Sequence, residues 1–111
     1  MNVIKVKNWY NVPNGYTGIV ERDDRTIAWH KNGDLHREDG PAYIRNDGVT
    51  YWDLDGRAIW DSHKKLELTN QIILSKTKHP DYPTVQVWKV LDKDKVWEQI
   101  VIPGMEEFII E

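Results

Sequence analysis

A repeat of 23 residues is the feature that most constrains how this chain can fold. The residues that recur at this spacing are Trp29 and Trp52, Gly33 and Gly56, and Asp24 and Asp47. Each Gly of the repeat directly follows Asn32 or Asp55. Asn-Gly and Asp-Gly are preferred in two-residue hairpin turns, because both central positions need a positive φ angle. The repeat therefore predicts two β-hairpins within residues 14–60, each with an aromatic strand, a tight turn and a second short strand.

The turn that precedes each aromatic strand differs between the two copies. The second copy reads Asn46-Asp47-Gly48, whereas Arg25 stands in the first copy where Gly48 stands in the second. Glycine adopts a left-handed backbone without steric cost, and arginine does not. The sequence therefore predicts that the first turn uses a different geometry, or that Asp24 takes the left-handed position.

The repeat ends after Trp60, and residues 61–111 form a predicted capping region. Spacings of four and seven among Leu66, Leu68, Ile72 and Ile73 favour a short helix within residues 64–76. Two apolar segments flank the polar turn at residues 92–94, which predicts a hairpin over residues 85–102. The last residues are too apolar for a free tail, and we expect them to pack as a terminal strand.

Composition agrees with a mainly β fold. The chain has 111 residues, including six Trp and five Tyr, and aromatic residues are enriched in strands. This length is typical of one domain. We therefore expect a single domain over residues 1–111, built as a twisted antiparallel sheet of repeated hairpins plus a C-terminal hairpin, with at most one short helix.

Charge and composition restrict the classes of partner. The formal net charge is −3, which argues against nonspecific binding to nucleic acid, because such binding depends on neutralising phosphates. The chain has no Cys, so it has neither disulfides nor thiolate metal sites. No apolar run approaches the roughly 20 residues of a membrane span. We expect a cytoplasmic protein without a membrane partner.

One segment resembles a known repeat family. Residues 35–42 read Leu-His-Arg-Glu-Asp-Gly-Pro-Ala, which resembles the signature of variant MORN (membrane occupation and recognition nexus) repeats. The resemblance covers Gly15 to about Trp60 and implies β-hairpins stacked into an elongated sheet. It also implies a small accessory protein of a tailed phage or an antitoxin-like bacterial protein. Such a protein would inhibit or sequester a host defence or toxin protein, in the host cytoplasm if it is phage-encoded.

His36 and the carboxylates beside it allow two interpretations. A His flanked by Glu38 and Asp39 could act as a general base, which leaves an enzyme using His36 and Asp39 as a minor alternative. The favoured interpretation is structural, because Asp-Gly-Pro at residues 39–41 marks a connection between strands. The four His residues are scattered and no Cys accompanies them, so we predict no metal site and no cofactor.

Aromatic residues of the repeat could form either the core or a binding surface. For the Trp residues the repeat period favours the core, whereas strand alternation favours exposure of Tyr43 and Arg45. The residues predicted to contact a partner protein are Tyr43, Arg45, Tyr51, Trp52, His36 and Arg37. The alternative is a sponge-like protein that binds a small molecule or nucleotide in an aromatic pocket with Arg37 or Arg45. An exposed sheet edge would also allow a homodimer.

Overall fold

The computed structural model describes residues 2–111 and confirms a mainly β fold. Short strands follow one another through tight turns, and the two helical segments are single 3-10 turns. The elements are β1 (Val3–Val6), η1 (Trp9–Asn11), β2 (Gly18–Arg22), β3 (Ile27–Lys31), β4 (Asp34–Leu35), β5 (Tyr43–Ile44), β6 (Thr50–Leu54), β7 (Arg57–Asp61), β8 (Leu66–Glu67), β9 (Ile72–Lys78), β10 (Gln86–Asp92), β11 (Lys95–Val101), η2 (Met105–Phe108) and β12 (Ile109–Ile110). None of the helical segments among residues 2–111 is long and apolar enough to cross a bilayer.

The chain divides into two compact units. The first unit comprises the residues up to 37 together with 41–62, and the second comprises residues 38–40 and 63–111. All seven strands from β1 to β7 belong to the first unit and form one sheet. This division lies close to the end of the repeat at Trp60, where the sequence predicts that the pattern changes.

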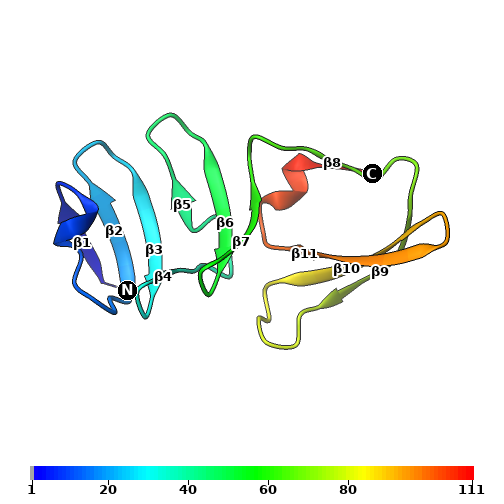
Figure 1. The fold of residues 1–111 in the computed structure, drawn as a ribbon, viewed down its shortest axis with the longest axis horizontal. Coiled ribbons are helices and arrows are strands. Elements are labelled where there is room, and N and C mark those ends of the chain that lie inside the picture. The colour runs from blue at the N-terminus through cyan, green and yellow to red at the C-terminus, as the bar shows by residue number, and fades with distance from the viewer. Residues whose placement is uncertain (1) are drawn as a thin grey trace. The chain divides into compact units, whose positions relative to one another are not determined.

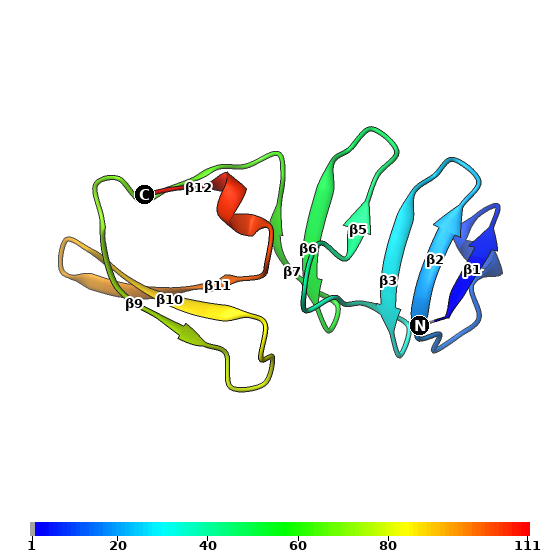
Figure 2. The same cartoon turned by 180° about the vertical axis from the view of Figure 1, so that it is seen from behind.

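The sheet of the first unit has the order β1-β2-β3-β5-β6-β7, and β4 pairs with β3. Strands β2, β3, β5 and β6 lie side by side in both views of the molecule (Figures 1 and 2). All pairs are antiparallel except β1 and β2, which run parallel. Parallel neighbours need a crossover connection, and residues 7–17, which contain η1, supply it. The predicted hairpins are antiparallel, and the parallel strand β1, which precedes the repeat, makes the sheet a mixed one.

The two predicted Gly-containing hairpin turns are confirmed. Both central residues of each turn have positive φ angles: Asn32 (51°), Gly33 (85°), Asp55 (48°) and Gly56 (78°). Each turn is also hydrogen-bonded to the segment that precedes its hairpin in the chain. The amide of Gly33 donates to the carbonyl of Tyr16, and the amide of Gly56 donates to the carbonyl of Leu35, both at 2.9 Å. The repeat therefore stacks one hairpin on the next through backbone bonds as well as side chains.

The turn before each aromatic strand has the same geometry in both copies. Arg25 itself adopts the left-handed conformation with φ 72°, and Gly48 has φ 90°. Asp24 Oδ1 accepts a hydrogen bond from the Thr26 amide (3.0 Å), and Asp47 Oδ1 accepts the equivalent bond from the amide two residues on (3.2 Å). Both predicted alternatives for the first turn are therefore wrong, because the Asp side chain stabilises a turn that places arginine in a glycine-type conformation.

The second unit contains a three-stranded antiparallel sheet of order β11-β10-β9 and a parallel pair of β8 and β12. The predicted hairpin over residues 85–102 is confirmed as β10 and β11, and the predicted terminal strand as β12. The helix predicted within residues 64–76 is wrong, since β8 and β9 occupy that segment. Ile73 pairs opposite the fully buried Val90, so cross-strand packing on β10 overrides the helical spacing of the apolar residues.

Candidate functional site

One face of the first unit's sheet gathers polar and aromatic side chains from both repeats. Strand pairing places Val20 opposite Ala28, Ala28 opposite Tyr43, and Tyr43 opposite Tyr51. Paired residues point to the same side of a sheet, and side chains alternate along each strand. His30 and Asp53, two residues beyond Ala28 and Tyr51, therefore share this side. We call it the groove face and define it by Val20, Ala28, His30, Tyr43, Tyr51 and Asp53.

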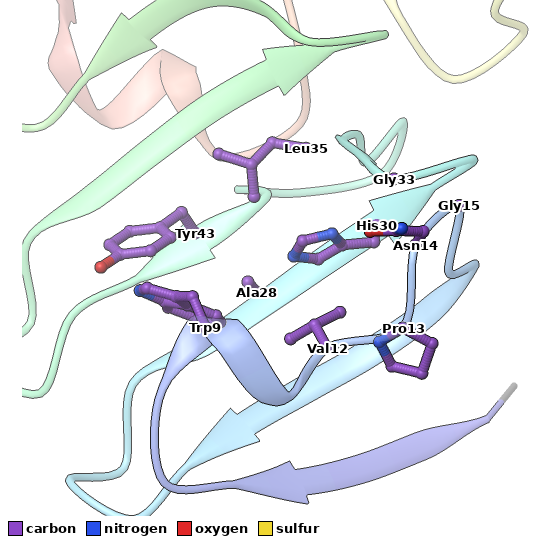
Figure 3. A pocket seen from close by; sticks show the side chains of 10 residues that line it. All are labelled: Trp9, Val12, Pro13, Asn14, Gly15, Ala28, His30, Gly33, Leu35 and Tyr43. Carbon is purple, nitrogen blue, oxygen red and sulfur yellow. The ribbon is translucent and has the colours of Figure 1, made fainter.

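The crossover between β1 and β2 packs over part of the groove face and leaves a hollow beneath it (Figure 3). The ring of Trp9, in η1, lies with its centroid 6.3 Å from that of His30 and 6.0 Å from that of Tyr43. This first hollow has a volume of about 370 Å³. It is lined by Trp9, Val12, Pro13, Asn14, Gly15, Ala28, His30, Gly33, Leu35 and Tyr43. Its walls are mostly apolar, with the imidazole of His30 among them.

A second hollow adjoins the first on the same face. Its volume is about 560 Å³, and Leu35 and Tyr43 line both hollows. The second hollow is lined by Arg22, Asp24, Thr26, Leu35, Tyr43, Arg45, Asn46, Tyr51 and Asp53. The rings of Tyr43 and Tyr51 meet edge to face, with centroids 5.5 Å apart. Tyr43 therefore contacts aromatic rings in both directions, Trp9 on one side and Tyr51 on the other.

The repeat places an equivalent ion pair on each side of the second hollow. Arg22 Nη2 lies 3.0 Å from Asp24 Oδ2, and Arg45 Nη2 lies 2.6 Å from Asp47 Oδ2. The hydrogen bond from the Thr26 amide lowers the pKa of Asp24. A hydrogen bond to the Tyr51 hydroxyl and the nearby Asp47 carboxylate raise the pKa of Arg45. Each of the two arginines therefore already has a carboxylate partner.

Asp53 is the unusual residue of the second hollow. Its side chain is buried, with 7% of the residue exposed, and Oδ1 has no hydrogen-bond partner. Burial raises the pKa of Asp53 to about 6, because an ionised carboxylate loses its hydration there. Neither arginine of the hollow is among the causes of this change in pKa. The carboxyl group is therefore close to its titration range at neutral pH and has no compensating positive charge.

Two further buried polar atoms without a hydrogen-bond partner lie along the same two hollows. They are Arg22 Nε and His30 Nδ1, and with Asp53 Oδ1 they are the buried side-chain atoms without a hydrogen-bond partner within residues 2–111. His30 and Asp53 are 23 residues apart in the sequence, so the repeat places one such residue in each hollow. Burial lowers the pKa of His30, which favours its neutral form. Buried polar atoms are nearly always hydrogen-bonded, so the gathering of three such atoms makes the two hollows the candidate site.

Three of the six residues predicted for partner binding meet in the second hollow, namely Tyr43, Arg45 and Tyr51. The other three lie elsewhere. Trp52 is only 2% exposed, and strand alternation points it to the opposite side of the sheet from Tyr51. The guanidinium of Arg37 stacks on the ring of Trp29, 4.0 Å from its centroid.

His36 is also buried, with 8% of the residue exposed. Its Nδ1 accepts a hydrogen bond of 2.9 Å from the amide of Asp55, in the turn between β6 and β7. The imidazole therefore connects one hairpin to the turn of the next. This geometry corresponds to the structural interpretation of the His36 motif. Within the described residues no group of three or more His, Cys, Asp or Glu side chains could hold a metal ion.

Sequence reasoning missed Trp9, Arg22, His30 and Asp53 as residues of this site. For three of them a signal was present in the 23-residue period, which aligns Arg22 with Arg45 and His30 with Asp53. Trp9 precedes the repeat, and only the crossover brings it over the groove face. No known protein family, curated protein or solved structure matches the chain.

Proposed function

We propose that this chain is a non-enzymatic protein-binding module and that the partner occupies the two hollows of the groove face. The observation that carries the proposal is the coincidence of aromatic rings with buried polar atoms that have no intramolecular partner. Aromatic and Arg side chains dominate the energetics of protein interfaces. A partner segment would cover the rings of Trp9, Tyr43 and Tyr51 and supply hydrogen bonds to the unpaired atoms.

The surroundings of His36 support a non-enzymatic function. A general base needs an accessible nitrogen within hydrogen-bond reach of its substrate. The Nδ1 atom of His36 is instead engaged by the Asp55 amide within a buried connection. We therefore assign the His36 motif to the folding of the repeat.

The resemblance to variant MORN repeats suggests which class of partner to test. We propose that the protein is a phage or bacterial accessory protein that inhibits or sequesters a host defence or toxin protein in the cytoplasm. The groove face would act by occupying a surface of that partner.

The experiment is affinity capture from bacterial lysate at physiological salt, with the wild type and two variants. Tyr43→Ala removes the ring shared by both hollows, and Val96→Ala changes an exposed apolar residue (58%) in the second unit. We expect one protein at stoichiometric yield with the wild type and Val96→Ala, and its loss with a folded Tyr43→Ala variant. Equal capture by all three proteins would refute the assignment of binding to the groove face.

A second candidate function is the binding of a small molecule in the first hollow. Its volume of about 370 Å³ lies in the range of ligand pockets, which are also mostly apolar with few polar groups. Mass spectrometry of small molecules in the same eluates tests this candidate. A metabolite retained by the wild type without a protein partner would replace the protein-binding proposal.

A further inference from the structure

We propose that the second hollow binds a basic side chain, Lys or Arg, of the partner protein, with Asp53 as its counter-ion. This inference rests on the proposed protein-binding function and adds the chemistry of the contact. It is carried by the position of the Asp53 carboxyl, which lines the hollow while being more than nine-tenths buried.

The charges around the hollow leave one negative charge uncompensated. The Arg22 and Asp24 pair and the Arg45 and Asp47 pair each neutralise themselves within 3.0 Å. When Asp53 ionises, no cation of the hollow is paired with it, and its Oδ1 atom has no hydrogen-bond partner. A cationic group that enters the hollow would supply both the missing charge and the missing donor. An anionic ligand would have to compete with the carboxylate already paired to each arginine.

The aromatic residues of the hollow are suited to the same ligand. Tyr43 and Tyr51 line the hollow together with Asp53, and Asp53 lies two residues after Tyr51 on β6. Ring faces attract ammonium and guanidinium groups, and more strongly when these are desolvated. The stem of a Lys or Arg side chain is apolar and packs well against aromatic rings. Carboxylate and rings therefore match the two parts of one basic side chain.

The burial of the Asp53 carboxyl with no hydrogen-bond partner for Oδ1 is a cost to the isolated protein. Burial raises the pKa of this carboxyl to about 6, so its ionised form is destabilised in the unbound state. A bound cation would remove that cost, because an opposite charge nearby favours the ionised form. A binding role thus gives a physical reason for a group that the unbound fold stabilises poorly.

The residue at the equivalent repeat position in the first hollow predicts that this hollow accepts a different kind of partner side chain. His30 stands at the repeat position of Asp53, and its surroundings favour a neutral imidazole. Trp9 and Val12 cover it from the crossover (Figure 3). The first hollow therefore suits an apolar side chain, and selection for a basic residue is a property of the second hollow alone.

The test is selection of binders from a yeast-displayed library of random linear peptides, using the full-length protein. The wild type is compared with Asp53→Asn and with Asp23→Asn, which removes an exposed carboxylate from the neighbouring turn. We expect peptides selected on the wild type to share one Lys or Arg. The affinity of these peptides should fall at least tenfold for the Asp53→Asn protein. It should fall equally for the wild type when the shared Lys or Arg of the peptide is replaced by norleucine. It should not change with Asp23→Asn.

Each other outcome contradicts a defined part of the reasoning. Selected peptides that compete for the groove face but share no basic residue would overturn this inference and leave the protein-binding proposal standing. The same holds for basic peptides that bind Asp53→Asn as tightly as the wild type. If no peptide is enriched over the background, both this inference and the proposed function are contradicted.

Discussion

Replacing Asp53 by Asn should stabilise the unbound protein at neutral and alkaline pH, and the gain should depend on pH. The carboxyl of Asp53 is buried, with one oxygen lacking a partner. Its pKa rises from the ordinary value of 3.8 to about 6 through burial. Asn has nearly the same shape and never ionises, so the variant removes the charge with little change in packing.

The size of the effect follows from the linkage between protonation and folding. Each pH unit between the folded and unfolded pKa values corresponds to about 1.4 kcal/mol, so a pKa of about 6 against 3.8 corresponds to about 3 kcal/mol. Below pH 3.8 both states are protonated and the wild type carries no penalty. As the pH rises, the unfolded state loses its proton first and the free energy of unfolding falls. Above pH 6 the full penalty of about 3 kcal/mol is present.

The measurement is urea unfolding of the wild type and Asp53→Asn between pH 4 and pH 8, followed by Trp fluorescence and far-UV circular dichroism. The advantage of the variant should grow by about 2.5 kcal/mol from pH 4 to pH 8. Asp23→Asn serves as the control for the loss of one exposed negative charge. A difference between the wild type and Asp53→Asn that stays constant with pH, or that reverses sign, would refute the argument that Asp53 is desolvated and unpaired.

Four substitutions test the geometry of the first unit by the free energy of unfolding in urea. Gly18→Ala should cost about 3 kcal/mol or more, because φ is 144° and the new Cβ would lie 2.6 Å from the carbonyl oxygen of Asn2. Gly48→Ala meets no atom within 4 Å, so only its left-handed backbone costs about 1 kcal/mol; an equal loss at both glycines would contradict the steric argument. Arg25→Gly should raise stability by up to about 1 kcal/mol, and a lower stability would show that the arginine side chain supports its turn. His36→Ala should cost about 2 kcal/mol. Unchanged stability would contradict the structural interpretation of the His36 motif.

The local structure of the repeat could be predicted because turn chemistry is a property of neighbouring residues. Asn32-Gly33 and Asp55-Gly56 specify hairpin turns through the φ angles that they tolerate, and both turns form as predicted. The same local reasoning failed at Arg25, where the intrinsic preference of arginine opposes the turn. There the Asp24 side chain and the pairing of β2 with β3 outweigh a cost of about 1–2 kcal/mol.

In the capping region, the spacing of apolar residues did not identify the correct secondary structure. Ile72 and Ile73 fit a helical face by position, yet they lie in β9, an edge strand paired with β10. Short apolar segments are ambiguous between helix and strand until their neighbours are known. The hairpin over residues 85–102 was predictable because its two strands are adjacent in sequence.

Tyr43, Arg45 and Tyr51 of the candidate site could be recognised from the sequence, whereas Asp53 could not. Alternation along β5 and β6 places Tyr43 and Tyr51 on one face and Trp52 on the other. The role of Asp53 depends on its burial, and burial depends on which strands and turns surround it. The lack of a hydrogen bond to its Oδ1 atom is a property of the folded surroundings and has no sequence signal.

The sequence by itself determined the period of the repeat, the Asn-Gly and Asp-Gly turns and the mainly β character, because these follow from local residue patterns. The tertiary structure decided the parallel crossover that carries Trp9 over the groove face, the pairing of β9 with β10, and the two hollows. These features join residues that are far apart in the chain, and their stability comes from burial and packing summed over many partners. No local pattern encodes that sum, so the groove face emerges only when the strands are assembled.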